Sequence, residues 1–381
     1  MFPGKQGKDV GVWTPRSVEY AWNNQQLLKD CGLIPYMFHK VYGYTATMLG
    51  CNAGDYPYLD ALPGLRLEFL PDCNSRQEHL TVNLQFLQEH YNKIDILVLH
   101  GPYLYFNNPY LRIYRSLRPD GKVVLQLDAN SQWMDRTCWT NPDFQYMLDQ
   151  CDVIAASCRK MQQHLNKKWP RWTIDYIPNG FYNTSGQIIN VTYEQKENIL
   201  LTVGRIGIKE KQNNVLMEAF AKVYKELVGW NVHLVGAIDD GFKQYIDDYF
   251  TRNPELTSRV IFKGLVEKKI ELFAEYARAK IFVLTSHMEG GTPNVIAEAL
   301  YHGCYQITSE IDACDDITNN GDIGKCFPIS NKSTDALADL LLEVCSDEAL
   351  ISGAFLRTLS YAHNNYDYEL IIKRLHHLLF L

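Results

Sequence analysis

The sequence lacks the patterns that mark membrane, nucleic-acid-binding and metal-binding proteins. No run of about 18 or more apolar residues occurs, which excludes a predicted membrane span. The net charge of −7 argues against a nucleic-acid-binding protein, which would carry a surplus of basic residues. The 10 cysteines include no Cys-x-x-Cys pair and no His/Cys cluster at metal spacing. The first residues also lack the apolar core of a signal peptide, so we expect reduced thiols in a cytoplasmic protein.

What the sequence does contain is an alternation of strand-like and helix-like segments. With 381 residues, 46% hydrophobic and 21% charged, the chain is long enough for two soluble domains. In the first half, helical stretches such as 78–92 and 157–168 separate apolar runs that predict strands at 9–14, 44–49, 65–70, 95–100, 122–127, 153–157 and 173–177. A second series predicts strands at 199–204, 231–236, 259–264, 280–285 and 305–309. This alternation is typical of parallel α/β layers.

A cluster of turn-forming residues, "PNGFYNTSGQ" at 178–187, interrupts the alternation and predicts a domain boundary. We expect an N-terminal Rossmann-like domain over 1–180 and a C-terminal one over 181–361, facing each other across a cleft. The last helix, about 348–380, is longer than the second domain needs. We expect its end, about 362–381, to pack back on the first domain. Ligands in such doubly wound sheets bind at the carboxyl ends of the strands.

The stretch "SHMEGGTPNVIAEAL" at 286–300 places two glutamates, Glu289 and Glu298, around a turn. Pro293 suits the first turn of a helix, so amides before it would face an anion at the positive helix end. These amides belong to Gly290, Gly291 and Thr292. Carboxylates accept hydrogen bonds from sugar hydroxyls, so a phosphate flanked by carboxylates indicates a nucleotide-sugar. The alternative is a loop and a buried helix with two solvated glutamates.

Four motifs in this order resemble the GT-B glycosyltransferases, specifically the retaining enzymes of glycosyltransferase family 4. They are "IPNGF" (177–181), "TVGRIGIKEKQNNVLMEAF" (202–220), "VIFKGLVEKKIELFAEYARAKIFVLTS" (260–286) and "EGGTPNVIAEAL". The resemblance covers about 175–345 well and the first domain loosely. One departure is the glutamate spacing, which is nine residues here and usually eight in the family. Aligning Pro293 and Asn294 with the family motif keeps Glu298 in place and puts one extra residue in the turn after Glu289.

The resemblance implies a donor site built from these motifs. Arg205, after Gly204, and Lys211 would stabilise the negative charge that grows on the leaving diphosphate. Lys209 competes with Lys211 for this role, and a solvated Arg/Lys pair is the plain alternative. The base would lie against Gly264 and Val266, and Glu298 would bind the ribose hydroxyls. Glu289 and the amides of the turn would hold the donor sugar and its phosphate.

In the first domain the resemblance implies less. Gly32, in "KDCGLIPY" (29–36), would open a helix whose N-terminus faces the diphosphate. Asp128 ends the expected fifth strand, where the family often has a histidine. His100 ends the neighbouring strand, and a histidine satisfied within the loop is the favoured interpretation. Asp128 and Glu289 are candidate site residues without being assigned as nucleophiles.

We therefore expect a retaining glycosyltransferase that transfers a sugar from a nucleoside-diphosphate sugar, UDP-linked, to a glycan, lipid-linked or protein acceptor. No Asp-x-Asp pair occurs, so no metal and no cofactor are expected. A nucleotide-sugar epimerase and a silent sugar-nucleotide-binding subunit are the alternatives. The basic stretch 158–172, with two tryptophans, is a candidate for peripheral contact with the inner face of a membrane, but a helix end with solvated lysines and a packed Trp is the favoured interpretation. The sequence does not set the oligomeric state.

Overall fold

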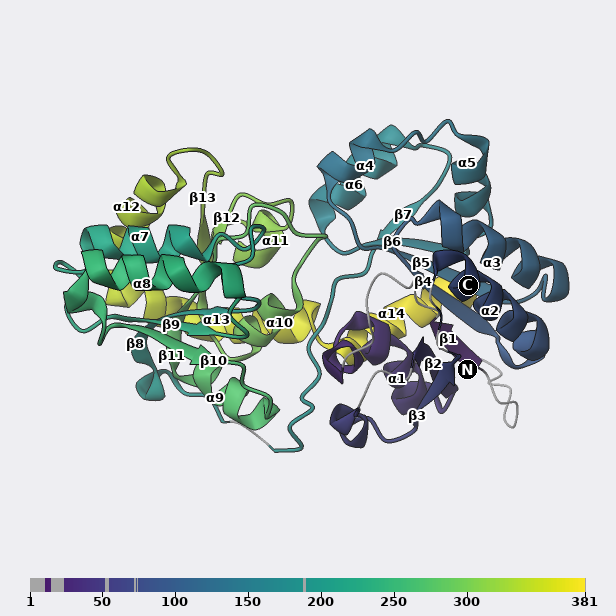
Figure 1. The fold of residues 1–381 in the computed structure, drawn as a ribbon, viewed down its shortest axis with the longest axis horizontal. Helices are drawn as coiled ribbons and strands as arrows, with labels where there is room; N and C mark the ends of the chain where they lie inside the picture. The colour runs from purple at the N-terminus through teal and green to yellow at the C-terminus, as the bar shows by residue number, and fades with distance from the viewer. Residues whose placement is uncertain are drawn as a thin grey trace. The chain divides into compact units, whose positions relative to one another are not determined.

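The structure is a computed structural model that describes residues 11–14, 24–51, 55–71, 73, 75–187 and 190–380. The chain divides into two compact units. The first unit comprises Met1–Thr184 and Tyr368–Leu381, and the second comprises Ser185–Asp367. Figure 1 shows that each unit holds one sheet with helices packed against it. Among the described residues, no helix is both long and apolar enough to span a bilayer.

The first unit is built on a seven-stranded parallel sheet with strand order β3-β2-β1-β4-β5-β6-β7. Its strands are β1 (Gly11–Thr14), β2 (Thr45–Cys51), β3 (Leu65–Leu70), β4 (Ile96–His100), β5 (Lys122–Leu127), β6 (Val153–Ala156) and β7 (Ile174–Tyr176). The central strands are apolar throughout because helices pack on the sheet and leave no strand face to water. Residues Val123, Val124 and Leu125 of β5 are all fully buried.

Seven α-helices belong to the described part of this unit. They are α1 (Asp30–Tyr42), α2 (Arg76–His90), α3 (Leu104–Leu117), α4 (Ser131–Arg136), α5 (Pro142–Asp149), α6 (Arg159–Lys168) and α14 (Tyr368–Phe380). The helix α14 is the end of the chain and lies alongside α1, in yellow in Figure 1. Its residues Ile372 and Leu375 are buried in the same apolar cluster as Met37 and Phe38 of α1. The end of the chain therefore completes the core of the unit in which the chain begins.

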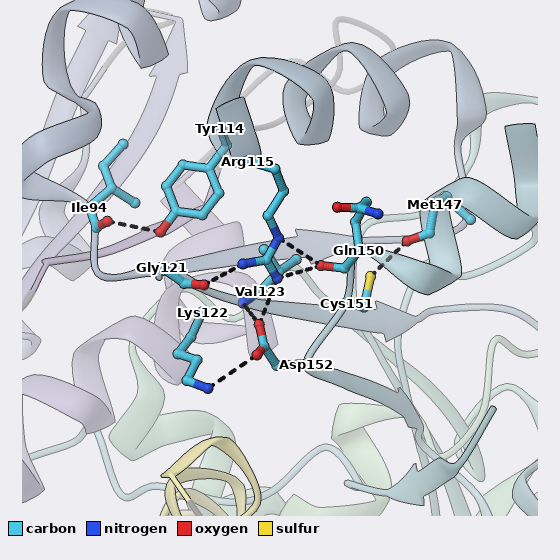
Figure 2. Close-up of polar contacts among 10 residues, drawn as sticks. All are labelled: Ile94, Tyr114, Arg115, Gly121, Lys122, Val123, Met147, Gln150, Cys151 and Asp152. Atoms are coloured by element: carbon cyan, nitrogen blue, oxygen red, sulfur yellow. Dashed lines mark hydrogen bonds and ion pairs between the residues drawn. The ribbon is translucent and has the colours of Figure 1, made fainter. Parts of the chain in front are cut away.

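A polar cluster ties the amino ends of β5 and β6 to α3, as Figure 2 shows. Arg115 donates to the carbonyl oxygen of Gly121 and pairs with Asp152 at 2.7 Å. The Asp152 carboxylate also accepts from the backbone N–H of Val123 at 2.8 Å, and it pairs with Lys122 at 3.2 Å. These charges are half-buried and mutually satisfied, so they fix the sheet at the edge opposite to the carboxyl ends of its strands.

The second unit holds a six-stranded parallel sheet with strand order β10-β9-β8-β11-β12-β13. Its strands are β8 (Glu197–Val203), β9 (Asn231–Val235), β10 (Val260–Gly264), β11 (Ala279–Leu284), β12 (Tyr305–Ser309) and β13 (Gly324–Phe327). Its helices are α7 (Asn213–Val223), α8 (Lys243–Arg252), α9 (Lys269–Arg278), α10 (Asn294–Tyr301), α11 (Cys314–Thr318), α12 (Ser333–Cys345) and α13 (Glu348–Asn365). Short 3₁₀ turns lie at 24–28, 57–61 and 91–93 in the first unit, and at 193–195, 240–242 and 254–256 in the second unit.

Two sequence-based expectations about this part of the chain are wrong. The segment 348–380 is not one helix, because α13 ends at Asn365 and α14 begins at Tyr368. The cysteines are not all reduced, because Cys314 and Cys326 form a disulfide between α11 and β13. Strand β13 aligns with β12, pairing Thr308 with Cys326, and this brings the end of β13 next to α11. The spacing of 12 residues between the two cysteines gave no sign of this proximity.

Candidate functional site

The candidate site lies at the carboxyl ends of β8 and β11, where the strand order of the second sheet reverses. Strand β8 pairs with β9 on one side and with β11 on the other. Connections leave in opposite directions from such a point, so a crevice forms there in doubly wound sheets. Gly204 and Arg205 follow β8 directly, and Arg205 is exposed. The predicted cationic segment therefore begins at the position where this fold binds ligands.

The loop after β8 is held against the loop after β9. Gly204 N–H donates to Val235 O at 2.9 Å, and Ile206 N–H donates to Ala237 O at 2.8 Å. Gly236 permits this approach, because a Cβ added there would lie 1.7 Å from Gly204 O. Further along, buried Asn213 accepts from the backbone N–H of Gly207 at 2.8 Å. The segment that carries Arg205 and Lys211 is thus fixed at both ends.

Lys211 and Glu289 form an ion pair between the loop before α7 and the loop after β11. The side chains are 20% and 13% exposed, so both charges are largely removed from water. Thr285, directly after β11, donates its hydroxyl proton to the Lys211 carbonyl at 2.7 Å and holds the loop in place. By contrast, Lys209 is exposed. The structure therefore brings Lys211, and not its competitor, to the predicted sugar-side glutamate.

The turn 290–292 leads from Glu289 into α10. Gly291 has φ of 128°, a conformation that favours glycine. Thr292 is 1% exposed. Pro293 is the residue before α10 and not, as predicted, within its first turn. Its φ of −64° still directs the chain into the helix, so the N–H groups at the start of α10 follow the turn directly.

Glu298, in the second turn of α10, is held by two donors that the sequence did not reveal. Its Oε1 pairs with Lys269 Nζ at 2.9 Å, and its Oε2 accepts from Tyr276 Oη at 2.8 Å. Both partners come from α9. Burial, together with the Glu298 carboxylate, raises the pKa of Tyr276 well above its usual value, so this hydroxyl stays protonated and donates. A carboxylate has about four acceptor positions, which leaves two for the paired hydroxyls of a ribose.

We expect Tyr276→Phe to raise the donor KM about fivefold with little change in kcat. The variant removes one of the two donors that orient Glu298, an effect of about 1 kcal/mol. Tyr249→Phe is the matched control, since Tyr249 is fully buried in the same unit and its hydroxyl donates to Met217 O at 2.9 Å. Saturation kinetics on both variants check this. Equal changes in KM would mean that Tyr276 acts through stability alone.

The predicted base-binding residues follow β10. Gly264 adopts φ of 68°, and its carbonyl oxygen accepts from Gly236 N–H at 2.8 Å. That bond links the end of β10 to the same glycine that meets Gly204. Val266 is half-buried in the segment before α9. The ends of β8, β9 and β10 are therefore joined in one row of backbone contacts.

Of the two site residues predicted in the first unit, Gly32 does not have the predicted position at a helix start, and Asp128 follows the fifth strand as predicted. The helix α1 begins at Asp30, so Gly32 is its third residue and does not open it. The Gly32 N–H donates to Lys29 O at 3.0 Å, and a Cβ there would lie 2.1 Å from Leu27 O. Close backbone packing therefore explains this glycine. Asp128 is exposed directly after β5.

His100, at the end of β4, pairs through Nδ1 with Asp30 at 3.1 Å. The side chains are 16% and 13% exposed. The sequence favours a histidine satisfied within its loop, but the observed partner of His100 comes from α1. His100 and Gln126 are partners in neighbouring strands, so His100 lies at the same sheet edge as Asp128.

Both tryptophans of the basic stretch 158–172 are packed. Trp169 is fully buried against the edge of Phe144, with ring centroids 5.4 Å apart. Trp172 is 9% exposed, and its Nε1–H donates to Asp149 at 2.9 Å. The aromatic side chains on which a membrane contact would depend are therefore committed to the interior of the first unit.

Comparisons with known proteins agree with this architecture. Residues 197–347 match the family model of glycosyl transferases group 1. A comparison with curated protein sequences finds no significant match. Among solved structures, a glycosyltransferase from Rickettsia africae has a TM-score of 0.72 at 16% identity, covering 98% of both chains.

Two further solved structures are similar over nearly the whole chain. HepE from Anabaena, in complex with UDP and glucose, has a TM-score of 0.71 at 14% identity, covering 97% of this chain and 99% of its own. Sucrose-phosphate synthase from Thermosynechococcus elongatus has a TM-score of 0.71 at 14% identity, covering 97% and 98%. The fold is thus the GT-B fold of two Rossmann-like units. The family match and the fold together support a glycosyltransferase enzyme.

Proposed function

We propose that this chain is a retaining glycosyltransferase that uses a UDP-linked sugar donor and no metal ion. The observation that carries the proposal is the Lys211–Glu289 pair, placed beside the 290–292 turn at the reversal point of the second sheet. The similar HepE structure contains UDP and glucose, which supports the choice of base. The acceptor in this proposal is a glycan, a lipid-linked sugar or a glycoprotein.

In this reaction the bond between the sugar C1 and the diphosphate oxygen breaks, and a bond from C1 to the acceptor oxygen forms on the same face. The acceptor hydroxyl gives its proton to the departing phosphate oxygen. Arg205 and Lys211 stabilise the charge that develops on the diphosphate. Glu298 binds the ribose, and Glu289 with Gly290–Thr292 holds the sugar and phosphate. Asp128, in the first unit, is a further candidate site residue, and neither Asp128 nor Glu289 is assigned as a nucleophile.

Incubation with a panel of UDP-, GDP- and ADP-sugars tests the class of reaction. Release of free UDP, alone or with a glycosylated acceptor, supports a transferase. An isomerised sugar would identify an epimerase, and an unchanged donor that still binds would identify a silent binding subunit. The anomeric configuration of the product, read by NMR, decides between retention and inversion.

We expect this activity to be unchanged in excess EDTA. Arg205, Lys211 and the N-terminus of α10 supply the positive charge that a divalent ion would otherwise provide. The measurement is the rate of UDP release with EDTA, and then with added Mn²⁺ or Mg²⁺. Loss of activity in EDTA that Mn²⁺ restores would contradict the metal-independent mechanism.

A further inference from the structure

A pocket of about 470 Å³ opens in the second unit between the start of α7 and the loop that joins β13 to α12. Its wall includes Thr285 and His287 after β11, and Ser309 at the end of β12. Its volume falls in the range of small-molecule sites. None of the residues assigned above to the donor lines it. The inference drawn from this pocket therefore does not rest on the proposed function.

The buried end of the pocket offers hydrogen-bond acceptors. Thr285 and Ser309 are 4% and 1% exposed. Thr285 donates its hydroxyl proton to Lys211 O, and Ser309 donates its proton to Ser286 O. Each hydroxyl oxygen can then only accept a bond from a ligand, because its single proton is already used. The buried end is thus suited to the hydroxyl groups of a ligand, with Phe327 and Val215 supplying apolar surface.

The open end of the pocket offers donors and positive charge. Lys209, Ser330 and Asn331 line it and are exposed. Among the described residues that line the pocket there is no carboxylate. The helices α7 and α12 both begin at this end, which adds to the positive potential. This end is suited to an anionic group.

From this arrangement we infer that the pocket binds a small phosphorylated sugar or polyol, with its hydroxyls toward Thr285 and Ser309 and its phosphate toward Lys209 and Asn331. The ligand is distinct from the donor nucleotide-sugar. Because Thr285 also holds the Lys211 carbonyl, the site adjoins the segment that carries Lys211.

The test is calorimetric titration of the full chain with glucose 6-phosphate, inorganic phosphate and glucose, each in the presence of saturating UDP. We expect saturable binding of glucose 6-phosphate, at least tenfold weaker binding of inorganic phosphate, and weaker binding again of glucose. Lys209→Gln and Asn331→Asp should each weaken binding of glucose 6-phosphate at least tenfold. The first removes the cation, and the second places a negative charge at the open end.

Lys243→Gln is the matched control, because Lys243 is a 66% exposed lysine of α8 outside the pocket. Its binding should equal that of the unaltered chain, and thermal unfolding should show all three variants folded. Binding of glucose 6-phosphate that UDP abolishes would place the ligand in the donor site and overturn the inference. Absence of saturable binding, or equal binding by Lys209→Gln, Asn331→Asp and the control, would overturn it as well.

Discussion

Lys211→Ala is expected to lower kcat/KM for the donor by roughly 100-fold or more. In the proposed reaction, negative charge grows on the diphosphate as the sugar leaves, and a fixed cation there stabilises the transition state more than the bound donor. Loss of one such group typically costs about 10²–10³ in kcat. The measurement is saturation kinetics of UDP release.

The same substitution also removes the partner of Glu289, which is only 13% exposed. Removing one partner of a largely buried ion pair costs about 3 kcal/mol of stability or more, because it leaves the other charge unpaired. The double variant Lys211→Ala/Glu289→Gln separates the two effects, because it removes the unpaired charge and should recover stability without recovering activity. Lys280→Ala is the control outside the site: Lys280 is 11% exposed and pairs at 2.7 Å with Glu348, which is 57% exposed. It should keep its rate and lose less stability than Lys211→Ala, because the Glu348 carboxylate stays in water.

One outcome would contradict the assignment of the lysine itself. If Lys209→Ala lowers kcat/KM and Lys211→Ala leaves it unaltered, Lys209 and not Lys211 supplies the cation that stabilises the diphosphate. Thermal unfolding of each variant shows whether a lost rate reflects lost structure.

The strands were predictable because parallel strands buried under helices are continuous apolar runs. The observed bounds of β3, β5 and β12 equal the predicted ones, and the other predicted strands differ by at most two residues at either end within the described residues. Residues 9 and 10 of the first predicted strand lie outside the described residues. Strand β13 was missed, since "GKCF" is short and carries a lysine and a glycine. Its place is set by pairing with β12 and not by its own pattern.

The partners of the site residues were not predictable, because they come from distant parts of the sequence. Lys211 and Glu289 are 78 residues apart, and Tyr276 and Glu298 are 22 apart. Position in a motif marked Lys211, Glu289 and Glu298 as candidates, whereas Tyr276 and Lys269 belong to a helix with an ordinary amphipathic pattern. A Tyr and a Lys seven residues apart on α9 share one helix face, which is the one signal that could have suggested a common target.

Gly32 shows how a motif-based reading fails. A glycine near a helix start suggests an anion site, but a glycine is also required wherever two backbones touch. The close contact with the backbone of Leu27 shows that packing requires this glycine. No feature of the sequence "KDCGLIPY" distinguishes a glycine needed for packing from one needed at an anion site.

The two glutamates of the 286–300 stretch are expected to give different kinetic patterns when each is replaced by glutamine. Glu298→Gln should raise the donor KM with a smaller effect on kcat. Its proposed target, the ribose, does not change during the reaction, so its loss removes binding that ground state and transition state share. The amide also loses one acceptor oxygen, and its NH₂ group faces the donating Lys269 or Tyr276.

Glu289→Gln should mainly lower kcat. Its proposed target, the donor sugar, gains positive charge as the bond to phosphate breaks, so a carboxylate there strengthens its contact only as the reaction proceeds. The structure gives the two side chains separate partners: Glu289 pairs with Lys211, and Glu298 pairs with Lys269 and Tyr276. Glu289→Gln keeps the shape of the side chain and removes its charge, so Lys211 becomes a stronger ligand for the diphosphate and the donor KM should fall or stay level.

Full saturation kinetics on both variants measure how each substitution divides its effect between kcat and the donor KM. Identical patterns for the two, or a silent Glu289→Gln, would mean that the nine-residue spacing has moved Glu289 away from the sugar and left it only the task of pairing with Lys211.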